Sequence, residues 1–304
     1  MIDALRNQYE LDELLGQLKL PRSSYYYARK KRDRPEKYAE LRSIVKESFV
    51  SSNSTYGYRR IHADIRHTFG KISEKIIRKI MREENLKVIH VKVKKYSAYE
   101  GEISPETANL VERNSHADVP NKLILTDITE FHIPAGKVYL SPAIDCFDGM
   151  PATWTIGTSP NAELVNTILD SVISQLDPRD KPVIHSDRGG HYRWPDWIRK
   201  TEESGIIRSM SRKGCFADNA ACERFFGHLK TEMFYGRNWE DVSLEKFIDI
   251  LNRYIIWYRE KRIKETLGYM SPMEYRKSKG IAVLQVSQVS LKLPPPLTER
   301  RTGA

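Results

Sequence analysis

Three acidic residues stand in settings where a carboxylate can do chemistry. Asp127 lies in Leu-Thr-Asp-Ile-Thr-Glu, Asp187 in His-Ser-Asp-Arg-Gly-Gly-His-Tyr and Glu223 in Asp-Asn-Ala-Ala-Cys-Glu-Arg-Phe-Phe-Gly. Carboxylate oxygens are the ligands that hard divalent cations prefer, and a pair of such ions can clamp the attacking and leaving oxygens of a phosphoryl displacement. The three residues therefore predict metal ligands in a nuclease or strand transferase that acts on DNA.

Each carboxylate also has a simpler interpretation as a strand-edge, turn or surface residue. Asp127 lies in an otherwise apolar strand, where an unpaired charge costs free energy unless it binds a metal. Asp187 precedes two glycines, which let the backbone turn sharply past a site. Glu223 is expected on a helix, and Lys230, seven positions later, shares its face. The occurrence of all three acids on suitable elements favours the metal site.

The chain from residue 122 onward alternates between strand and helix patterns. Strands are expected at Leu123–Thr129, Val138–Phe147, Pro151–Ile156, Val183–Asp187 and Ile206–Ser211. Helices are expected at Asn161–Leu176, Trp194–Ser204, Asp218–Met233 and Ser243–Lys261. This order is typical of an α/β protein with a mixed five-stranded sheet flanked by helices, which is the order of the ribonuclease H-like fold.

The residues before this core are helical in pattern. Two short helices, Leu11–Leu18 and Pro21–Lys30, predict a helix-turn-helix-like segment over residues 1–35, for which an ordinary helical hairpin is an equal alternative. Residues 36–96 predict a basic helical DNA-binding domain that ends in an extended connector. We expect a linker at residues 97–121, the catalytic core with its C-terminal helix at 122–276, and a tail at 277–304.

The net charge of +10 is concentrated at one end of the chain. Residues 1–100 hold 23 Lys and Arg against 13 Asp and Glu, whereas residues 101–304 hold 27 of each. Such asymmetry is typical of a polyanion-binding arm, because each neutralised phosphate releases counterions, although a solvated helical surface is the alternative. The residues expected to contact DNA are Arg22, Arg29, Lys30, Arg59, Arg60, Lys92, Lys94, Lys95 and Lys230. The second short helix is also expected to project Ser23, Tyr25 and Tyr26 toward DNA.

Composition excludes several other classes of protein. The 304 residues are 40% apolar and 30% charged, which predicts a globular protein of two or three units. No apolar run approaches the roughly 18 residues of a membrane span, and the first residues lack the apolar segment of a signal peptide. Cys146, Cys215 and Cys222 have no paired spacing, so neither a disulfide framework nor a zinc site is expected. We therefore expect a cytoplasmic protein.

The ordered set of motifs resembles insertion-sequence transposases of the IS-three type, specifically the OrfB product with its retroviral-integrase-like core. The similarity extends over nearly the whole chain to about Arg276. The matching motifs are Tyr56-Gly57-Tyr58-Arg59-Arg60-Ile61, Thr126-Asp127-Ile128-Thr129-Glu130-Phe131, Tyr139-Leu140 with Asp145, His185-Ser186-Asp187-Arg188-Gly189, Ser209-Met210-Ser211-Arg212-Lys213-Gly214, Asp218-Asn219-Ala220 with Glu223, Phe225-Phe226-Gly227, Lys230 and Leu267-Gly268-Tyr269-Met270-Ser271-Pro272.

The resemblance implies a DNA transposase that cuts and rejoins strands at the terminal inverted repeats of an insertion sequence. Asp127, Asp187 and Glu223 match the metal ligands of the family, and Lys230 matches the lysine that often follows the Glu. It also implies two Mg²⁺ ions per active site, replaceable by Mn²⁺, with water and then a freed 3′-hydroxyl as nucleophiles. The implied partners are double-stranded element and target DNA, further copies of the chain, and an upstream OrfA-type segment, in the bacterial cytoplasm and associated with the nucleoid when bound to DNA.

Two other functions stay open at this point. A DNA-binding regulator with a vestigial catalytic core is one, although a relaxed site would be free to lose a carboxylate. A ribonuclease H-like nuclease without strand transfer is the other, although the basic first 100 residues favour a protein that organises DNA ends. The roles of His185 and His191, which flank Asp187, also stay open between positioning water or phosphate and a purely structural contact.

Overall fold

The computed structural model describes residues 2–32, 38–88, 107–112, 114–177, 179–212 and 216–282. The chain divides into a first unit of residues 1–47 and a second unit of residues 48–304. Three of the expected DNA contacts, Lys92, Lys94 and Lys95, lie outside the described residues, as does Cys215. Within the described ranges, no helix is both long enough and apolar enough to cross a membrane.

The first unit begins with the two short helices that the sequence predicts, preceded by one more turn. These helices are α1 (Ile2–Leu5), α2 (Leu11–Gln17) and α3 (Arg22–Arg32). Leu11, Leu15 and Tyr25 form a small buried core, and the Tyr25 hydroxyl donates a hydrogen bond to Asp3 at 2.6 Å. The expectation that Tyr25 projects toward DNA is therefore wrong, because its ring fills the space between the helices.

The expected helical stretch over residues 36–86 contains three helices. They are α4 (Ala39–Ser51), which crosses from the first unit into the second, α5 (Tyr58–Phe69) and α6 (Glu74–Glu83). Helices α5 and α6 contact each other and bury the apolar stripes that include Ile61 and Ile77. The His62 Nε2 atom hydrogen-bonds to the carbonyl of Ile72 at 2.7 Å, which ties α5 to the turn before α6.

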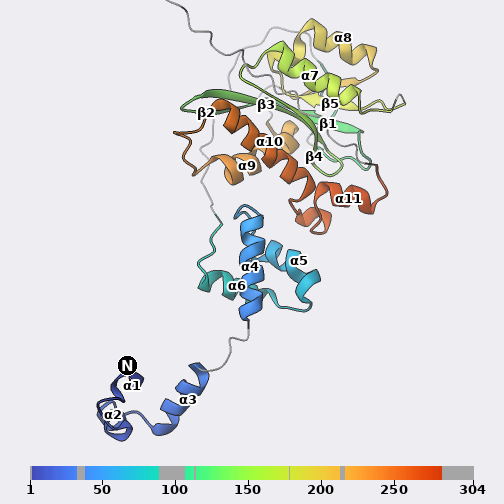
Figure 1. The fold of residues 1–304 in the computed structure, drawn as a ribbon. Coiled ribbons are helices and arrows are strands. Elements are labelled where there is room, and N and C mark those ends of the chain that lie inside the picture. Colours follow the sequence, from blue (N-terminus) through green and yellow to red (C-terminus); the bar gives the residue numbers. More distant parts are fainter. Residues whose placement is uncertain are drawn as a thin grey trace, which may run out of the picture. The chain divides into compact units, whose positions relative to one another are not determined.

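A mixed sheet forms the centre of the second unit (Figure 1). Its strands are β1 (Leu123–Thr126), β2 (Thr129–Ile133), β3 (Gly136–Asp145), β4 (Met150–Gly157), β5 (Val183–Ser186) and β6 (Ile207–Met210). Strand β3 pairs antiparallel with both β2 and β1 along one edge and with β4 along the other. Strands β1, β5 and β6 run parallel to one another. This is the ribonuclease H-like arrangement that the sequence predicts.

The sheet has six strands rather than five because the expected strand Leu123–Thr129 is broken. Strand β1 ends at Thr126 and β2 begins at Thr129, yet the register against β3 continues without a shift. In that register Pro142 stands opposite Asp127, and proline has no N–H to give to the ladder. The N–H of Ile128 instead donates to the Asp127 carboxylate at 2.7 Å. The break releases Asp127 from the sheet without changing the direction of the strand.

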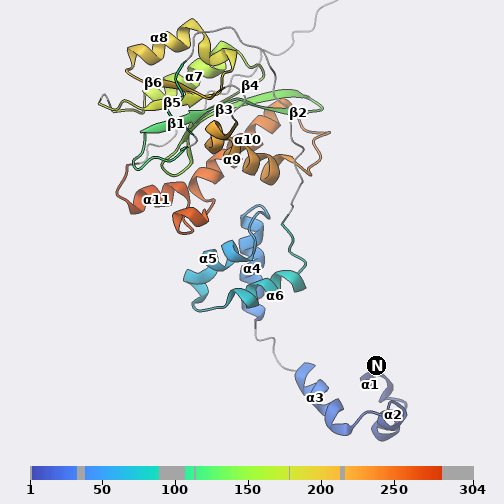
Figure 2. The same cartoon turned by 180° about the vertical axis from the view of Figure 1, so that it is seen from behind.

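Helices cover both faces of the sheet, with α7 and α8 on one side and α9 and α10 on the other (Figures 1 and 2). Their bounds are α7 (Ala162–Ile173), α8 (Pro195–Glu203), α9 (Ala220–Leu229), α10 (Leu244–Glu260) and α11 (Pro272–Ser278), with short turns at η1 (Gly190–Arg193), η2 (Phe216–Asn219), η3 (Lys230–Phe234) and η4 (Glu265–Leu267). Helix α9 contacts β1 and β3, and α10 contacts β3 and β4. The helix that carries Glu223 therefore lies over the strand that precedes Asp127.

Part of the expected linker at residues 97–121 belongs to the core instead. The N–H of Met210 on β6 donates to the carbonyl of Ala108 at 3.2 Å, so the chain before residue 112 runs beside the edge strand. Val111 and Ala117 are buried in the main apolar cluster. The expected linker is part of the core over these residues because two apolar side chains of an otherwise polar segment pack into the main apolar cluster.

A buried charge cluster attaches α11 to the turn after β3. Arg276 donates to Asp145 at 2.7 Å and to both oxygens of Asp148 at 2.7 and 3.1 Å. Asp145 also accepts the backbone N–H groups of Asn121 and Phe147, each at 3.0 Å. Both carboxylates and the guanidinium are almost fully buried. Because one guanidinium bridges both carboxylates, the cluster fixes α11 to the sheet.

We predict that Arg276→Met destabilises the protein by about 3–5 kcal/mol, because it leaves two buried carboxylates without their cation. Arg253→Met is the matched control, since Arg253 forms an exposed pair with Asp249 one turn away on α10. Exposed pairs of this kind contribute roughly 0.3–0.5 kcal/mol. Chemical denaturation of both variants measures the difference, and equal losses would contradict the assigned role of Arg276.

Candidate active site

The register of the parallel strands places two of the predicted carboxylates side by side. Strands β1 and β5 pair so that Thr126 stands opposite Ser186. Asp127 and Asp187 are the next residues on the two strands, and neighbouring strands lie about 4.8 Å apart. Both aspartates therefore leave the carboxyl edge of the sheet together, which is where ligands bind in α/β proteins.

The two aspartates repel each other in a poorly solvated setting. Burial, followed by the charge of Asp187 and to a lesser extent that of Glu223, raises the pKa of Asp127 to about 8. Burial also raises the pKa of Asp187, although the N–H of Gly189 and the nearby charges of His191 and Arg193 oppose that shift. A pair of buried carboxylates that resist ionising together is a site that a cation would stabilise.

Glu223 lies apart from this pair. Its side chain is exposed on α9, although it is near enough to contribute to the raised pKa of Asp127. Within the described residues, no group of three His, Cys, Asp or Glu side chains is placed to hold a metal ion. The structure thus brings Asp127 and Asp187 together and leaves Glu223 beside them, so its role as a ligand stays a prediction.

Lys230 lies close to Asp127, at a change of helix type. The expected helix Asp218–Met233 consists of the 3₁₀ turn η2, α9 and the π-helix η3, which begins at Lys230. The Lys230 ammonium lies 5.6 Å from the centre of the Phe131 ring. Burial lowers the pKa of Lys230, and the charge of Asp127 raises it again. The cation is therefore held near the acidic pair, on the side that the seven-residue spacing predicts.

A buried ion pair accounts for the π-helix. The Glu232 carboxylate accepts three hydrogen bonds from Arg262, at 2.6, 2.9 and 3.2 Å, and one from the Tyr254 hydroxyl at 2.7 Å. Single π-turns are rare and occur frequently at functional sites. In this π-turn the Glu232 carboxylate points inward to Arg262, and Lys230 lies near Asp127.

The two histidines around Asp187 differ in their surroundings. His185 is fully buried and hydrogen-bonds through Nδ1 to the Ser209 hydroxyl at 2.8 Å and through Nε2 to that of Ser211 at 3.0 Å. Burial lowers its pKa to about 4, so it is neutral at pH 7 and joins β5 to β6. His191 packs edge-on against Trp194, with ring centres 4.7 Å apart. His185 is thus structural, whereas His191 lies near the Asp187 charge.

Two buried hydroxyls beside the aspartates were not identified from the sequence. The Thr126 and Tyr192 hydroxyl oxygens are buried without a satisfactory hydrogen bond among the described residues. Burial raises the pKa of Tyr192, and the charges of Asp127 and Asp187 add to it, which places its ring near both. Oxygen donors with unmet hydrogen bonds around two repelling carboxylates fit a hard divalent cation. In the sequence, the one indication of Tyr192 was its position as the last residue of the motif that contains Asp187.

A glycine is needed at position 189 because the backbone there lies against the Asp187 carboxylate. Its N–H donates to the Asp187 carboxylate at 2.9 Å. A Cβ atom at Gly189 would lie 2.8 Å from the same carboxylate oxygen, whereas one at Gly190 would meet nothing within 4 Å. The first glycine therefore lets the backbone approach and orient the carboxylate, and the second does not touch it.

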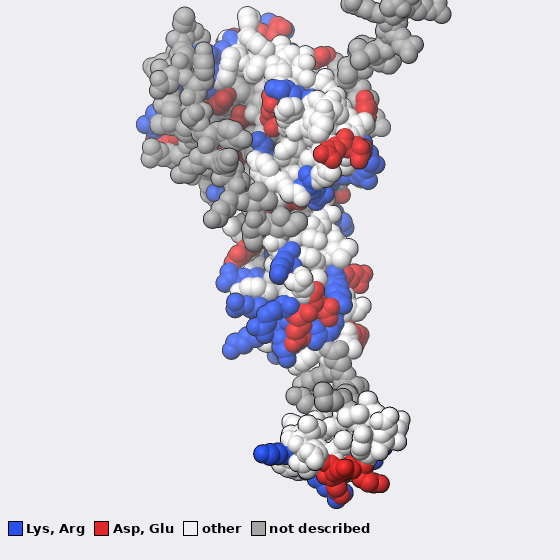
Figure 3. Space-filling model, turned by 90° about the vertical axis from the view of Figure 1, so that its left-hand side faces the viewer, with Lys and Arg blue, Asp and Glu red and all other residues white. Residues whose placement is uncertain are grey.

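The described residues that are expected to contact DNA differ in exposure: Arg22, Arg29, Lys30 and Arg59 are exposed, whereas Arg60 and Lys230 are half-buried. Arg22 pairs with Asp12 at 2.8 Å, and the side chains of Arg29 and Lys30 are exposed. Figure 3 shows Lys and Arg side chains gathered on the middle helical part of the chain, which includes α5 and α6. The exposed basic residues there are Arg59, Arg66, Lys75, Arg78, Lys79 and Arg82.

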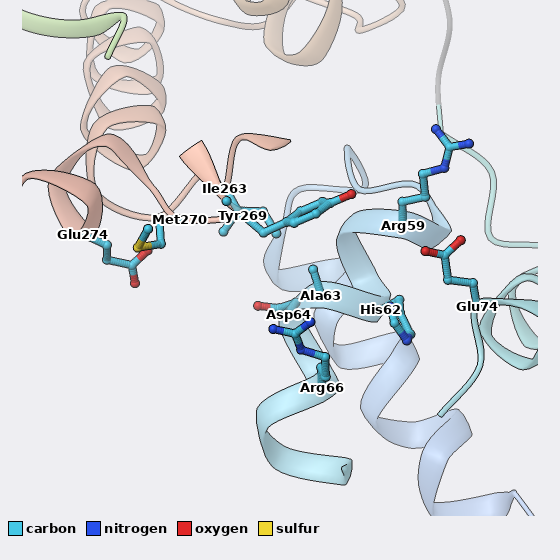
Figure 4. Close-up of a pocket in the computed structure, with 11 residues that line it drawn as sticks. Arg59, His62, Ala63, Asp64, Arg66, Glu74, Ile263, Tyr269, Met270 and Glu274 are labelled. Atoms are coloured by element: carbon cyan, nitrogen blue, oxygen red, sulfur yellow. The ribbon is translucent and has the colours of Figure 1, made fainter. Parts of the chain in front are cut away.

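Arg59 also borders a hollow of about 450 Å³ between α5 and the segment after α10 (Figure 4). In Figure 4, Arg59 and Glu74 lie on the same side of this hollow and Tyr269 extends toward them. Its lining mixes basic side chains with Asp64, Glu74 and Glu274. Two arginines and a histidine face three carboxylates, so the hollow has no excess of positive charge that would bind an anion.

Comparison with known proteins assigns the family. Residues 117–215 match the model of an integrase core domain, residues 223–279 match a second integrase core domain model, and residues 36–95 match an HTH-like domain. The chain is 37% identical over 276 residues to the putative transposase InsK for insertion sequence element IS150 of Escherichia coli K12, covering 91% of this chain and 96% of that protein. The chain belongs to the insertion-sequence transposases with an integrase core.

Two further likenesses accompany this assignment. The transposase is 51% identical over 281 residues to the probable transposase for insertion sequence element IS1353 of Shigella flexneri, covering 92% of this chain but only 55% of that protein. This chain therefore spans about half the length of that relative. The magnesium complex of the HTLV-2 integrase catalytic core domain covers 52% of this chain and 97% of its own, at 16% identity and a TM-score of 0.37.

We predict that Gly189→Ala weakens metal binding and DNA cleavage about 10- to 100-fold, because the new methyl group displaces the Asp187 carboxylate. The backbone at Gly189 has φ −54°, which alanine adopts without strain, so the fold is expected to survive. Gly190→Ala serves as the control and should keep nearly full activity. Equal activities of the two variants in Mn²⁺ titrations and cleavage assays would disprove this function of Gly189.

We also predict that the metal-free transposase loses stability as the pH rises toward about 8. The pKa of Asp127 is raised in the folded state, from roughly 3.9 in an unfolded chain. The stabilising contribution is therefore complete below the unfolded pKa and is lost as the pH rises through the folded pKa. Melting temperatures in EDTA should show this fall, and Asp127→Asn should flatten it. A wild-type profile that matches the variant's would contradict the assignment.

Proposed function

We propose that this transposase catalyses metal-dependent cleavage and joining of DNA strands at the terminal inverted repeats of an insertion sequence. The observation that supports this most strongly is the pair of half-buried, mutually repelling carboxylates at the ends of β1 and β5, whose pKa values are raised. Family membership makes DNA the polymer on which such a site acts. This pair gives the reason for a metal, because only a cation lets both aspartates ionise near neutral pH.

In this proposal Asp127, Asp187 and Glu223 hold two Mg²⁺ ions, for which Mn²⁺ can substitute. The bound ions supply charge neutralisation at the attacking and leaving oxygens of the phosphodiester. Asp127 and Asp187 approach from the sheet, and Glu223 approaches from α9. Lys230, held against Phe131, binds a phosphate oxygen next to the cleaved bond. Water and then a freed 3′-hydroxyl act as the nucleophiles, and no covalent enzyme intermediate is required.

The proposal extends to partners. Arg29, Lys30, Arg59 and Arg60 contact the backbone of element and target DNA, together with the basic connector after α6. Several copies of the transposase act together on the DNA, because two ends must be brought to one target. An upstream OrfA-type segment, as a fusion or a separate chain, adds recognition of the terminal repeats, and the reaction takes place on the bacterial nucleoid.

A regulator with a vestigial core is disfavoured by the electrostatics of the site. Two buried carboxylates destabilise a protein that does not use them, and either could be replaced by Asn without loss of shape. A nuclease without strand transfer has the same acidic residues and is therefore separable only by its products. The experiment below distinguishes all three.

We predict that the transposase, given labelled terminal-repeat DNA and Mg²⁺ or Mn²⁺, produces nicked and then joined strands, and that EDTA abolishes both. Glu223→Gln should abolish cleavage while leaving DNA binding within a few-fold, because the change removes a charge from an exposed side chain. Glu203→Gln, also exposed at the end of a helix, is the matched control.

The products and the variants decide between the functions. Nicked strands without joined products would indicate a nuclease. Tight DNA binding with no cleavage in either metal, also after an OrfA-type segment is added, would indicate a regulator. A large loss of DNA binding in Glu223→Gln would show that Glu223 is structural rather than a metal ligand.

A further inference from the structure

A cavity of about 710 Å³ lies on the other side of α9 from the aspartates. Arg224 and His228 line it from α9. These two residues are four apart and therefore share a helix face, whereas Glu223 and Lys230, seven apart, share a different one. The cavity is thus separate from the acidic site, although the same helix borders both.

The cavity has an excess of positive charge. Four cationic side chains line it, from α5, α9 and the segment after α10, together with His116 and His228: Arg60, Arg224, Arg262 and Lys264. Arg262 is already paired with Glu232. In the described part of the chain, Arg60, Arg224 and Lys264 form no ion pair with a carboxylate. The Lys264 ammonium donates instead to the backbone carbonyl of Asp148 at 2.6 Å.

The acidic residues around the cavity do not neutralise this excess. Asp148 is buried and committed to Arg276, with two hydrogen bonds at 2.7 and 3.1 Å. Glu265 also lines the cavity, but its side chain is exposed to solvent. One exposed carboxylate therefore faces three cations that form no ion pair in the described part of the chain, and the cavity favours an anion.

The basic groups around the cavity repel one another, and burial together with this repulsion lowers their pKa values. Burial, with the charges of Arg262 and Arg224 also contributing, lowers the pKa of Lys264 to about 8. Burial and Arg262 lower the pKa of Arg60 as well. His228 is brought to a pKa of about 4 by the same two causes, so it is neutral at pH 7. An anion placed between these groups would relieve the repulsion.

The walls of the cavity suit a sugar-phosphate unit rather than a bare ion. Four aromatic side chains line it: Phe147, Phe225, Tyr258 and Tyr275. The Arg262 guanidinium lies 5.0 Å from the centre of the Tyr258 ring, and the Lys264 ammonium lies 5.6 Å from it. Flat apolar surfaces next to cations are the combination that binds the backbone and bases of nucleic acids.

We propose that this cavity binds a backbone phosphate of the DNA substrate, with Arg60, Arg224 and Lys264 as its ligands. The inference rests on the proposed function, because it takes DNA as the substrate. It adds a contact on the face of α9 that points away from the aspartates. A phosphate held there restrains α9 from behind and so holds Glu223 and Lys230 over the acidic pair.

The test is the salt dependence of DNA binding by the full chain. Terminal-repeat DNA is titrated in EDTA, which prevents cleavage, at salt concentrations from about 50 to 300 mM. The slope of log K against log salt is negative, and each phosphate contact that is lost reduces its magnitude by about 0.9. Because the three cations share one phosphate, the double variant Arg60→Gln/Arg224→Gln should reduce the magnitude of the slope by up to about 0.9, and each single change should reduce it by less. A wild-type slope in the double variant overturns the proposal.

Matched variants separate charge from structure. Arg224→Lys keeps the cation and should retain the wild-type slope, and Arg253→Gln, which removes an exposed cation from α10 outside the cavity, should do the same. Arg224 is exposed, so its removal should leave the melting temperature unchanged. Lys264→Met, measured in the same way, tests the half-buried ligand independently and should also reduce the magnitude of the slope, by less than the double variant does.

Two further outcomes have a defined meaning. If inorganic phosphate binds to the wild type but not to the double variant while both have the same DNA slope, the cavity is a site for free anions and the proposal is overturned. If the wild type cleaves and joins DNA but the variants keep its slope, this inference fails and the proposed function stands. If the wild type neither binds nor cleaves DNA, the proposed function itself has failed.

Discussion

The placement of two like charges in a half-buried setting, at the ends of adjacent parallel strands, is the constraint on which the site depends. The register of β1 against β5 brings Asp127 and Asp187 together, and their reduced solvation raises the pKa of both carboxylates. Pro142 opposite Asp127 breaks the ladder and frees the carboxylate, and Gly189 lets the backbone bond to Asp187 without a clash. Without a metal, the two carboxylates raise the free energy of the folded protein when both are ionised. A bound divalent cation offsets this repulsion.

Buried ion pairs away from Asp127 and Asp187 stabilise the fold. Arg276 bridges two buried aspartates and fixes α11, while Arg262 pairs with Glu232 in the π-turn that begins at Lys230. Each carboxylate in these clusters is hydrogen-bonded to a guanidinium, whereas Asp127 and Asp187 accept hydrogen bonds from backbone N–H groups. The contrast separates groups that maintain the fold from groups that are available to a ligand. Around the cavity behind α9, Arg60, Arg224 and Lys264 likewise form no ion pair with a carboxylate in the described part of the chain.

Much of the architecture was predictable because it is local. Alternating patterns identified the strands and helices, and their order identified the ribonuclease H-like sheet and the neighbouring positions of Asp127 and Asp187. The features that were missed depend on residues far apart in sequence. The break at Asp127 requires Pro142 on β3, and the π-turn requires Arg262 at the end of α10. The burial of Val111 within an expected linker depends on β6, about 100 residues later, and a pattern of single residues contains none of this information.

The central claim is that the aspartate pair binds a divalent cation, and the most direct measurement is Mn²⁺ binding to the DNA-free protein by electron paramagnetic resonance. The account predicts saturable binding to the wild type that weakens by at least about 10-fold in both Asp127→Asn and Asp187→Asn. Asp180→Asn, an aspartate in the loop before β5, should bind like the wild type. Undiminished Mn²⁺ binding in the two site variants would contradict the account.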